Sequence, residues 1–274
     1  MNLNCKGTLI NITTPKVMGI LNITPDSFYD GGNLTNEGFI LAQAEKMLEE
    51  GATFLDIGGH SSRPGANEVS EKEELQRVVP AIEAILKQFP EALISIDTFR
   101  SEIVKKSVEA GAVMVNDISA GNLDSNMMKT VAQLKVPYVM MHMKGNPKTM
   151  VSLSEYKNVT KEVLFYFSEK LAEARALGLN DMMVDPGFGF AKTRQHNFEL
   201  LNHLELFKSL EVPLLVGISR KSMIYKTLQT TPEEALNGTM ALHSIALLKG
   251  ASILRVHDVK EAIECVTLLE NFKN

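Results

Sequence analysis

Short apolar runs alternate along the chain with longer stretches in which apolar residues recur at helical spacing. Eight of the runs are strand-like, and each ends at or near a polar residue. They cover residues 17–21, 53–58, 93–97, 113–117, 138–142, 182–187, 214–219 and 253–258. The runs are almost continuously apolar rather than alternating, which is typical of parallel strands that are covered on both faces. The pattern therefore predicts a parallel sheet with helices packed on it.

The stretches between these runs have the length and amphipathic spacing of helices. They cover residues 35–50, 71–88, 100–110, 124–134, 155–178, 195–209, 232–249 and 259–272. Four of them are followed by a glycine, as helices often are, at Gly51, Gly111, Gly178 and Gly250. The chain is thus expected to repeat one strand–helix unit.

Eight such units in 274 residues predict a (β/α)8 barrel that forms one domain over residues 1–274. An open doubly wound sheet is the alternative. Its first strand would be expected to lead into a GxGxxG turn, and the chain has none. Residues 1–15 are expected to form a short additional element that closes the N-terminal end of the barrel, or else to be disordered.

Composition narrows the class of protein. The chain is 45% apolar and 22% charged with a net charge of −5, which predicts a soluble globular protein and disfavours a broad nucleic-acid surface. Cys5 and Cys265 lie at opposite ends of the chain, so neither a disulfide framework nor a zinc site is indicated. No signal peptide or membrane-spanning run is visible, and we expect a cytoplasmic protein without a membrane or nucleic-acid partner.

Polar side chains stand at the end of every predicted strand. They are Asn22, Asp56, Asp97, Asn116, Asp117, His142, Asp185, Ser219, Arg220, Lys221, Arg255 and His257. One polar residue after a strand is usually a turn former or a helix cap. Because all eight strands end in this way, these residues indicate the active face of a barrel, which lies at the C-terminal ends of the strands.

The charges at these strand ends fall into two groups. Basic residues in an acidic chain indicate an anionic substrate, a phosphate or a diphosphate. They are Arg63, Lys221, Arg255 and His257. Asp97, Asn116 and Asp185 could line one edge of a planar heterocycle, because carboxylates match guanidine-like N–C–N edges. The alternative is that Asp97 and Asp185 pair with buried Arg or Lys residues and only hold the barrel together.

Two long loops, 22–33 and 58–70, are rich in small residues and are expected to act as mobile lids. Asn22 opens the first loop and could bind Mg2+ together with phosphate oxygens and water, although a turn-forming Asn is the commoner case. His142 could be catalytic or a structural histidine. Phe188 and Phe190, in a glycine-rich turn, could line an aromatic ligand or belong to the core.

Several strings together resemble the dihydropteroate synthases of the folate pathway, from about Val17 to Val259. They are VMGILNITPDSFYDGG, GATFLDIGGHSSRPGA, SIDTFR, VNDISAG, VMMHMKGNPKTM, DPGFGFAKTRQHNFELL, GISRKS and RVHDV. The resemblance implies a (β/α)8 barrel that is usually a homodimer. It also implies the condensation of 6-hydroxymethyl-7,8-dihydropterin diphosphate with 4-aminobenzoate, with Mg2+ as cofactor and diphosphate as leaving group.

The same resemblance assigns roles to matching residues. It implies Asn22 as the Mg2+ and diphosphate residue, and Asp97, Asn116 and Asp185 as pterin-edge ligands near Asp56. It implies Lys221 as the pterin-carbonyl ligand, and Arg255 with His257 as the diphosphate cradle. The aminobenzoate and lid group would be Phe28, Ser62, Arg63, Pro64, Phe190 and Ser222. Lys221, Asp97, Asp185 and Arg63 would carry the catalysis.

The chain departs from the family pattern at three positions. His60 stands where an acidic residue is common, Ser62 where Thr is common, and Phe54 where an aliphatic residue is usual. Because Ser62 keeps the hydroxyl but loses a methyl, its role is retained while sulfonamide sensitivity is left open.

Three other functions compete with this interpretation. They are a pterin-barrel methyltransferase domain, an inactive binding paralogue, and a Schiff-base aldolase that uses Lys221. The diphosphate cradle and the NITPDSF loop argue against the methyltransferase, and the retention of Asn22, Arg63 and Lys221 argues against the paralogue. Borohydride trapping of Lys221 would expose an aldolase.

Overall fold

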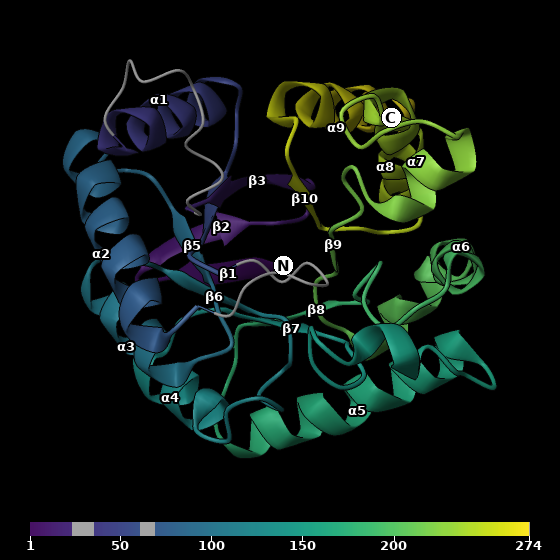
Figure 1. The fold of residues 1–274 in the computed structure, drawn as a ribbon, viewed down its shortest axis with the longest axis horizontal. Coiled ribbons are helices and arrows are strands. Elements are labelled where there is room, and N and C mark those ends of the chain that lie inside the picture. The colour runs from purple at the N-terminus through teal and green to yellow at the C-terminus, as the bar shows by residue number, and fades with distance from the viewer. Residues whose placement is uncertain (24–35, 61–68, 274) are drawn as a thin grey trace.

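The computed structural model describes residues 1–23, 36–60 and 69–273, and it shows a barrel of parallel strands inside a ring of helices (Figure 1). The barrel strands are β3 (Lys16–Asn22), β4 (Phe54–Gly58), β5 (Ile94–Asp97), β6 (Met114–Asp117), β7 (Tyr138–Met141), β8 (Met182–Asp185), β9 (Leu215–Val216) and β10 (Ile253–Val256). Their order is β8-β7-β6-β5-β4-β3-β10-β9, all parallel. A bridge between Val184 and Leu214 joins the two ends. The predicted (β/α)8 barrel is confirmed, and the open sheet is excluded.

The helices follow the strands as the sequence predicts. They are α1 (Asn36–Glu49), α2 (Glu71–Gln88), α3 (Ser101–Glu109), α4 (Met127–Leu134), α5 (Val159–Ala176), α6 (Arg194–Asn202), α7 (Ser222–Leu228), α8 (Leu236–Leu248) and α9 (Val259–Lys273). Ser70 and Glu73 form a reciprocal capping box that fixes the start of α2. Gly111 ends the turn after α3 at φ +120°, a left-handed conformation that favours glycine.

Two helical details differ from the prediction. The stretch 195–209 is divided into α6 and a 3-10 helix, η3 (Leu204–Leu210), while a second 3-10 helix, η2, spans Met150–Leu153. Helix α7 has only seven residues, too few for apolar spacing to reveal it, and it was not predicted. Its first residue follows Lys221 directly, so this short helix fixes one side of the active face.

The N-terminal residues form an antiparallel hairpin of β1 (Asn2–Cys5) and β2 (Thr8–Asn11). Leu3, Cys5 and Ile12 join one apolar cluster with side chains from the barrel interior. The barrel members are Met18, Phe54, Val113, Met114, Val139, Met183, Leu215 and Ile253. The hairpin therefore covers the N-terminal end of the barrel.

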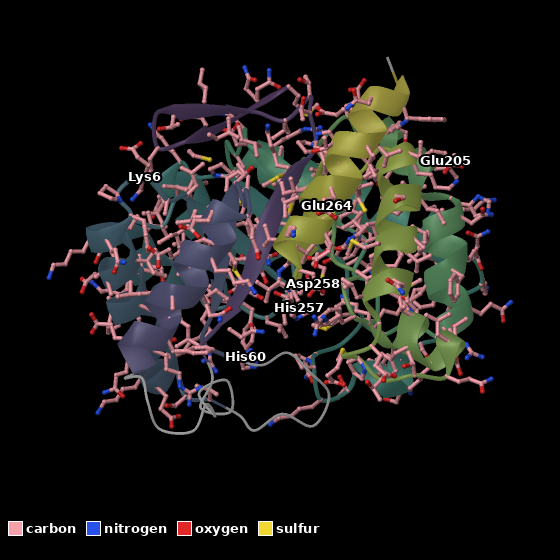
Figure 2. All side chains as sticks on the ribbon, turned by 90° about the horizontal axis from the view of Figure 1, so that it is seen from above. Lys6, His60, Glu205, His257, Asp258 and Glu264 are labelled. Atoms are coloured by element: carbon pink, nitrogen blue, oxygen red, sulfur yellow. The ribbon has the colours of Figure 1, made fainter. Side chains whose placement is uncertain are left out.

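The barrel interior changes from apolar to polar within two residues along several strands. Phe54 is followed by Asp56, Met114 by Asn116, Met183 by Asp185 and Ile253 by Arg255. Side chains two residues apart in a strand point to the same side, so each polar group lies one level above its apolar partner. An apolar floor thus supports a polar layer at the C-terminal end of the barrel. Figure 2 shows His60 and His257 toward that end and the hairpin at the opposite one.

Candidate active site

A cavity of about 580 Å3 opens at the C-terminal ends of the strands. Ten of the residues that the sequence indicated line it, namely Asn22, Asp97, Phe188, Phe190, Ser219, Arg220, Lys221, Ser222, Arg255 and His257. They come from β3, β5, β10 and the segments that follow β8, β9 and β10. The tertiary structure therefore brings together residues that lie far apart in the chain.

Arg255 is the centre of a charged network beneath this cavity. Its Nε donates to Asp56 Oδ2 at 2.5 Å, and its Nη2 donates to Asp97 Oδ2 at 2.6 Å. Asn116 Nδ2 donates to the same oxygen of Asp56 at 3.0 Å. Asp56 is fully buried, so its charge depends on Arg255 for compensation. The residue expected to hold diphosphate is thereby joined to the residues expected to hold the pterin.

The carboxyls at the cavity have altered proton affinities. Burial raises the pKa of Asp97, and the guanidinium of Arg255 opposes that rise. Burial also raises the pKa of Asp185, while Lys221 and the Gly187 N–H, which donates to Asp185 Oδ1 at 2.8 Å, pull it down. Partly desolvated carboxyls of this kind are typical of binding and catalytic sites.

Lys221 reaches across the cavity from the start of α7. Its Nζ donates a short hydrogen bond to the Phe188 carbonyl and lies 4.7 Å from the centre of the Phe190 ring. Burial lowers the pKa of Lys221 to about 8, although Asp185 opposes the change. Its ammonium therefore stands between a carboxylate and an aromatic wall, where a ligand carbonyl could replace the Phe188 acceptor.

The segments after β9 and β10 are fastened to each other. Ser219 Oγ and His257 Nδ1 lie 3.0 Å apart, and the His257 backbone N–H donates to the same Oγ at 3.2 Å. Arg220, in the left-handed conformation at φ +53°, forms a two-pronged ion pair with Asp258. The positions of Lys221 and His257 are thus set together.

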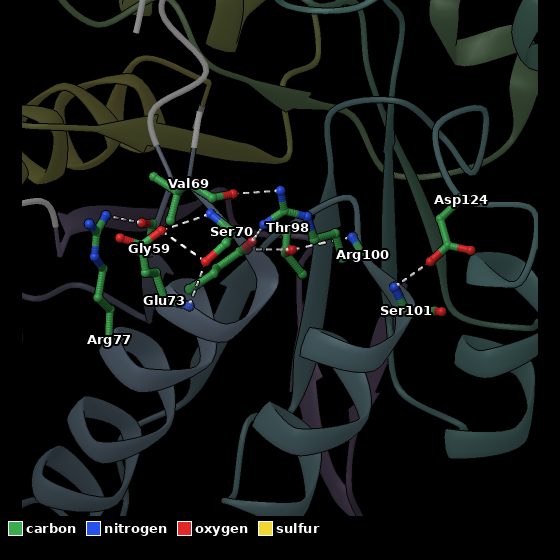
Figure 3. A network of polar contacts seen from close by, with 10 residues as sticks. Gly59, Val69, Ser70, Glu73, Arg77, Thr98, Arg100, Ser101 and Asp124 are labelled. Carbon is green, nitrogen blue, oxygen red and sulfur yellow. Dashed lines mark hydrogen bonds and ion pairs between the residues drawn. The ribbon is translucent and has the colours of Figure 1, made fainter. Parts of the chain in front are cut away.

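Figure 3 shows a second polar network, between the start of α2 and the residues Thr98 and Arg100, that the sequence analysis missed. Glu74 is 1% exposed, accepts from Thr98 Oγ1 at 2.7 Å and forms an ion pair with Arg100. Arg100 also donates to the Val69 carbonyl at 2.7 Å, while Arg77 donates to the Gly59 carbonyl at 2.9 Å. The network fixes residues on both sides of 61–68. An acidic residue four positions before Val78, on the apolar face of the helix, was the available signal.

Two of the polar residues at strand ends, Asp117 and His142, have structural contacts and do not line the cavity. Asp117 accepts from Tyr138 Oη, from Ser119 N and Oγ, and from Gly121 N, which satisfies its carboxylate completely. His142 is buried, is absent from the cavity lining and contacts Lys192. The structural alternative for His142 is therefore the one that the geometry supports.

Four residues expected at the aminobenzoate site, Phe28, Ser62, Arg63 and Pro64, lie outside the described residues, as do most of the two expected lid loops. Phe190 and Ser222 of the same group both line the cavity. Phe188, in contrast, is fully buried in the core, so only its carbonyl faces the site.

Comparison with known proteins identifies the family. A model of pterin-binding enzymes matches residues 18–257. The dihydropteroate synthase of Escherichia coli strain K12 is 45% identical over 272 residues, covering 98% of this chain and 96% of that protein. The chain belongs to the dihydropteroate synthase family.

Solved dihydropteroate synthases have the same fold throughout. The enzyme of Xanthomonas albilineans with 4-aminobenzoic acid superposes with a TM-score of 0.93 at 40% identity, over 99% of this chain and 98% of that one. A Yersinia pestis dihydropteroate synthase with a sulfonamide drug gives a TM-score of 0.93 at 42% identity, over 100% and 99%. The resemblance drawn from the sequence is confirmed, and the chain is a transferase of this family. Within the described residues, no helix is long and apolar enough to cross a membrane.

Proposed function

We propose that this cavity condenses 6-hydroxymethyl-7,8-dihydropterin diphosphate with 4-aminobenzoate to 7,8-dihydropteroate and releases diphosphate. The observation that carries the proposal is the ordered polar layer over an apolar barrel floor, with Asp97, Lys221 and Arg255 lining one cavity and Asp185 buried beside Gly217 of its wall. A Xanthomonas albilineans relative is solved with 7,8-dihydropteroate and another with 4-aminobenzoic acid.

The pterin would lie with its N–C–N edge toward the carboxylates. Asp185 and Asp97 accept N–H groups from the ring, Asn116 extends the same edge, and Lys221 donates to the ring carbonyl. Asp56 stays below, where it holds Arg255 and Asn116 in place through one oxygen. Phe190 and Ser222 form the neighbouring wall, on which the aminobenzoate ring would pack.

We expect Asp97→Asn and Asp185→Asn each to weaken pterin binding by about 1–3 kcal/mol, the usual scale of a charge-assisted hydrogen bond. An amide keeps the shape but replaces one acceptor oxygen with a donor. Calorimetry with the pterin diphosphate measures the loss, and Asp124→Asn, remote from the cavity, is the control. Wild-type affinity in both variants would mean that these carboxyls only hold the barrel together.

The leaving group would lie toward Asn22 and His257. Asn22 ends β3 beside Gly58, and a Cβ built on Gly58 would come within 3.5 Å of Asn22 Oδ1 and 3.8 Å of Asp97 Oδ2. Because Gly58 has no side chain, there is room for an ion beside the neutral amide oxygen of Asn22. Among the described residues, no cluster of three or more His, Cys, Asp or Glu could hold a metal ion. A single amide oxygen fits Mg2+, which commonly completes its octahedron with substrate phosphates and water.

When bound there, Mg2+ would neutralise charge on the departing diphosphate. The chain's own residues do the rest. Arg255 presents positive charge and N–H donors to the phosphate oxygens, and His257 adds a ring N–H donor. Asp97 and Asp185 stabilise the positive charge that the pterin methylene carries as the C–O bond breaks. The arylamine of 4-aminobenzoate is nucleophilic when neutral, so its attack needs no strong protein base.

We expect activity to depend on Mg2+ and Asn22→Ala to lower turnover at least 100-fold while changing the free energy of unfolding by less than about 1 kcal/mol. The reason is that Asn22 is an exposed strand end that contributes little packing. Steady-state rates over a Mg2+ titration after EDTA treatment, together with thermal unfolding, measure both quantities. EDTA-treated enzyme working at full rate would contradict the proposal.

The activity itself is tested by diphosphate release from the pterin diphosphate with and without 4-aminobenzoate. Release is expected only when both substrates are present, together with formation of dihydropteroate. Equal release without the arylamine would indicate a hydrolase instead. Treatment with borohydride should leave Lys221 unmodified, because the reaction requires no Schiff base.

A homodimer is proposed as the assembly. Helix α8 contains no charged residue, yet its outer side exposes Ala241, Ile245 and Leu248, and neighbouring α9 exposes Leu268 and Phe272. Large apolar side chains gathered on the outside of a barrel usually mark an interface. Light scattering of the purified chain tests this, and a monomer at micromolar concentration would refute it.

The location is proposed to be the cytoplasm. Cys5 and Cys265 are both free thiols, which suits a reducing compartment. Cell fractionation tests this location.

A further inference from the structure

The segment between β8 and α6, residues 186–191, is an unusually constrained piece of the active face. Gly187, Gly189 and Ala191 all have positive φ, at +70°, +84° and +49°. A Cβ on Gly187 would lie 2.1 Å from the His142 carbonyl oxygen, so the segment is pressed against the end of β7. Its Phe188 carbonyl binds Lys221, and its Phe190 ring lines the cavity.

Lys192 lies directly after this segment and is turned inward beneath it. It is only 8% exposed. Its Nζ lies 3.0 Å from the Gly187 carbonyl, 3.0 Å from the Phe190 carbonyl and 3.0 Å from His142 Nδ1, with the His142 carbonyl at 3.3 Å. No described carboxylate is among these contacts, so the residue does not form an ordinary ion pair.

The number of acceptors indicates which proton states are present. Four acceptor atoms surround one nitrogen, and three of them are at 3.0 Å. An ammonium has three donors and no acceptor, so it can satisfy all three, and His142 Nδ1 must then be unprotonated. A neutral amine could also serve these contacts, by donating to two carbonyls and accepting from an Nδ1–H. Three carbonyl oxygens around one nitrogen favour the charged form, however, and His142 is then the neutral tautomer with its proton on Nε2.

The groups around Lys192 have opposite effects on its pKa. Burial lowers its pKa, as do the ammoniums of Lys221 and Lys144, whereas the carboxylate of Asp185 raises it. His142 contributes no charge, because burial and Lys192 lower its pKa to about 2. Burial dominates and lowers the pKa of Lys192 well below its usual value, and Asp185 is the nearby anion that opposes this fall.

We infer that Lys192 is a positioning residue of the active site. Its ammonium binds the carbonyls of Gly187 and Phe190 from below, and this holds the Phe188 carbonyl toward Lys221 and the Phe190 ring toward the cavity. Residues 186–191 are thus held by hydrogen bonds to two lysines, Lys192 and Lys221. Lys192 does not line the cavity and acts on Lys221 through the segment. This inference rests on the proposed function only for its effect on pterin binding.

The proton assignment is tested on the wild-type enzyme by 15N NMR of histidine-labelled protein, with the His142 signals assigned from His142→Gln. The expected spectrum shows an unprotonated, hydrogen-bonded Nδ1 and a protonated Nε2 at neutral pH. A proton on Nδ1 would show that Lys192 is a neutral amine, and the inference would be wrong. This measurement needs neither substrate nor a variant of Lys192, so it stands even if such a variant fails to fold.

The positioning role is tested by calorimetry with the pterin diphosphate on Lys192→Met, Lys221→Met and the double variant. Lys192→Met is expected to weaken binding about 10- to 100-fold, the range for losing a hydrogen bond to a charged group. Because both lysines act through one segment, the double variant should bind within about threefold of the weaker single variant.

Lys249→Met is the matched control, since Lys249 Nζ also donates to a carbonyl, that of Asn202 at 2.6 Å, but far from the cavity. It should bind the pterin as the wild type does. Wild-type affinity in Lys192→Met, or losses that multiply in the double variant, would overturn the inference. A wild-type chain that binds no pterin would instead contradict the proposed function, whatever the His142 spectrum shows.

Discussion

Replacing Arg255 with methionine is expected to destabilise the protein by about 3–5 kcal/mol at neutral pH and to abolish activity. The guanidinium binds Asp56, which is completely buried, and Asp97, which is 17% exposed. Methionine fills a similar volume but leaves two carboxylates facing each other without a cation. Chemical denaturation measures the loss. Arg220→Met removes a more exposed ion pair with Asp258 and should cost about 1 kcal/mol or less.

The penalty in Arg255→Met should depend on pH in a defined direction. Burial already raises the pKa of Asp97 in the wild type, and removing Arg255 takes away the group that opposes the rise. A carboxyl with a raised folded-state pKa favours folding below its unfolded value, near 4, and loses this contribution as pH rises through the folded value. The variant should therefore lie closest to the wild type near pH 4 and fall further behind toward pH 7. A penalty that is constant with pH would show that lost packing, not uncompensated charge, is responsible.

Replacing Lys221 with methionine is expected to lower kcat/KM by about 100- to 1000-fold, the scale of losing one preorganised donor at a site of developing charge. Its ammonium lies between Asp185 and the Phe190 ring, so no other described donor occupies its place. Steady-state kinetics with both substrates measure the change. Lys249→Met is the control, and a loss of less than threefold in Lys221→Met would remove Lys221 from the reaction.

The same residue predicts the alkaline limit of activity. Because burial lowers the pKa of Lys221 to about 8, its ammonium is lost as pH rises through that value. The rate of the wild-type enzyme should then fall above pH 8. Lys221→Arg retains its charge throughout this range, so whatever activity it keeps should not show that fall. A fall at the same pH in the arginine variant would assign the titration to another group.

The sequence by itself determined the fold and the family. Eight apolar runs alternating with helices are typical of a parallel sheet covered on both faces, and the helices between them have spacing that matches a covering layer. The strings from VMGILNITPDSFYDGG to RVHDV were specific enough to identify the dihydropteroate synthases. Strand ends at Asp97, Asp185, Lys221 and Arg255 marked the active face, because a parallel barrel gathers those ends in one place.

Which contacts those residues make was decided only by the tertiary structure. Asp56 and Arg255 are 199 residues apart, and nothing local indicates that one guanidinium is shared between Asp56 and Asp97. The role of Lys192 was likewise invisible, and that of Glu74 was indicated only by its place on the apolar face of its helix. Charged residues on a helix or after a turn are usually exposed, and only packing turned these two inward. The periodic spacing of apolar residues shows which side chains are buried on the same face of a helix or strand. A single buried charge has no period, and its partners are fixed by the way the barrel closes.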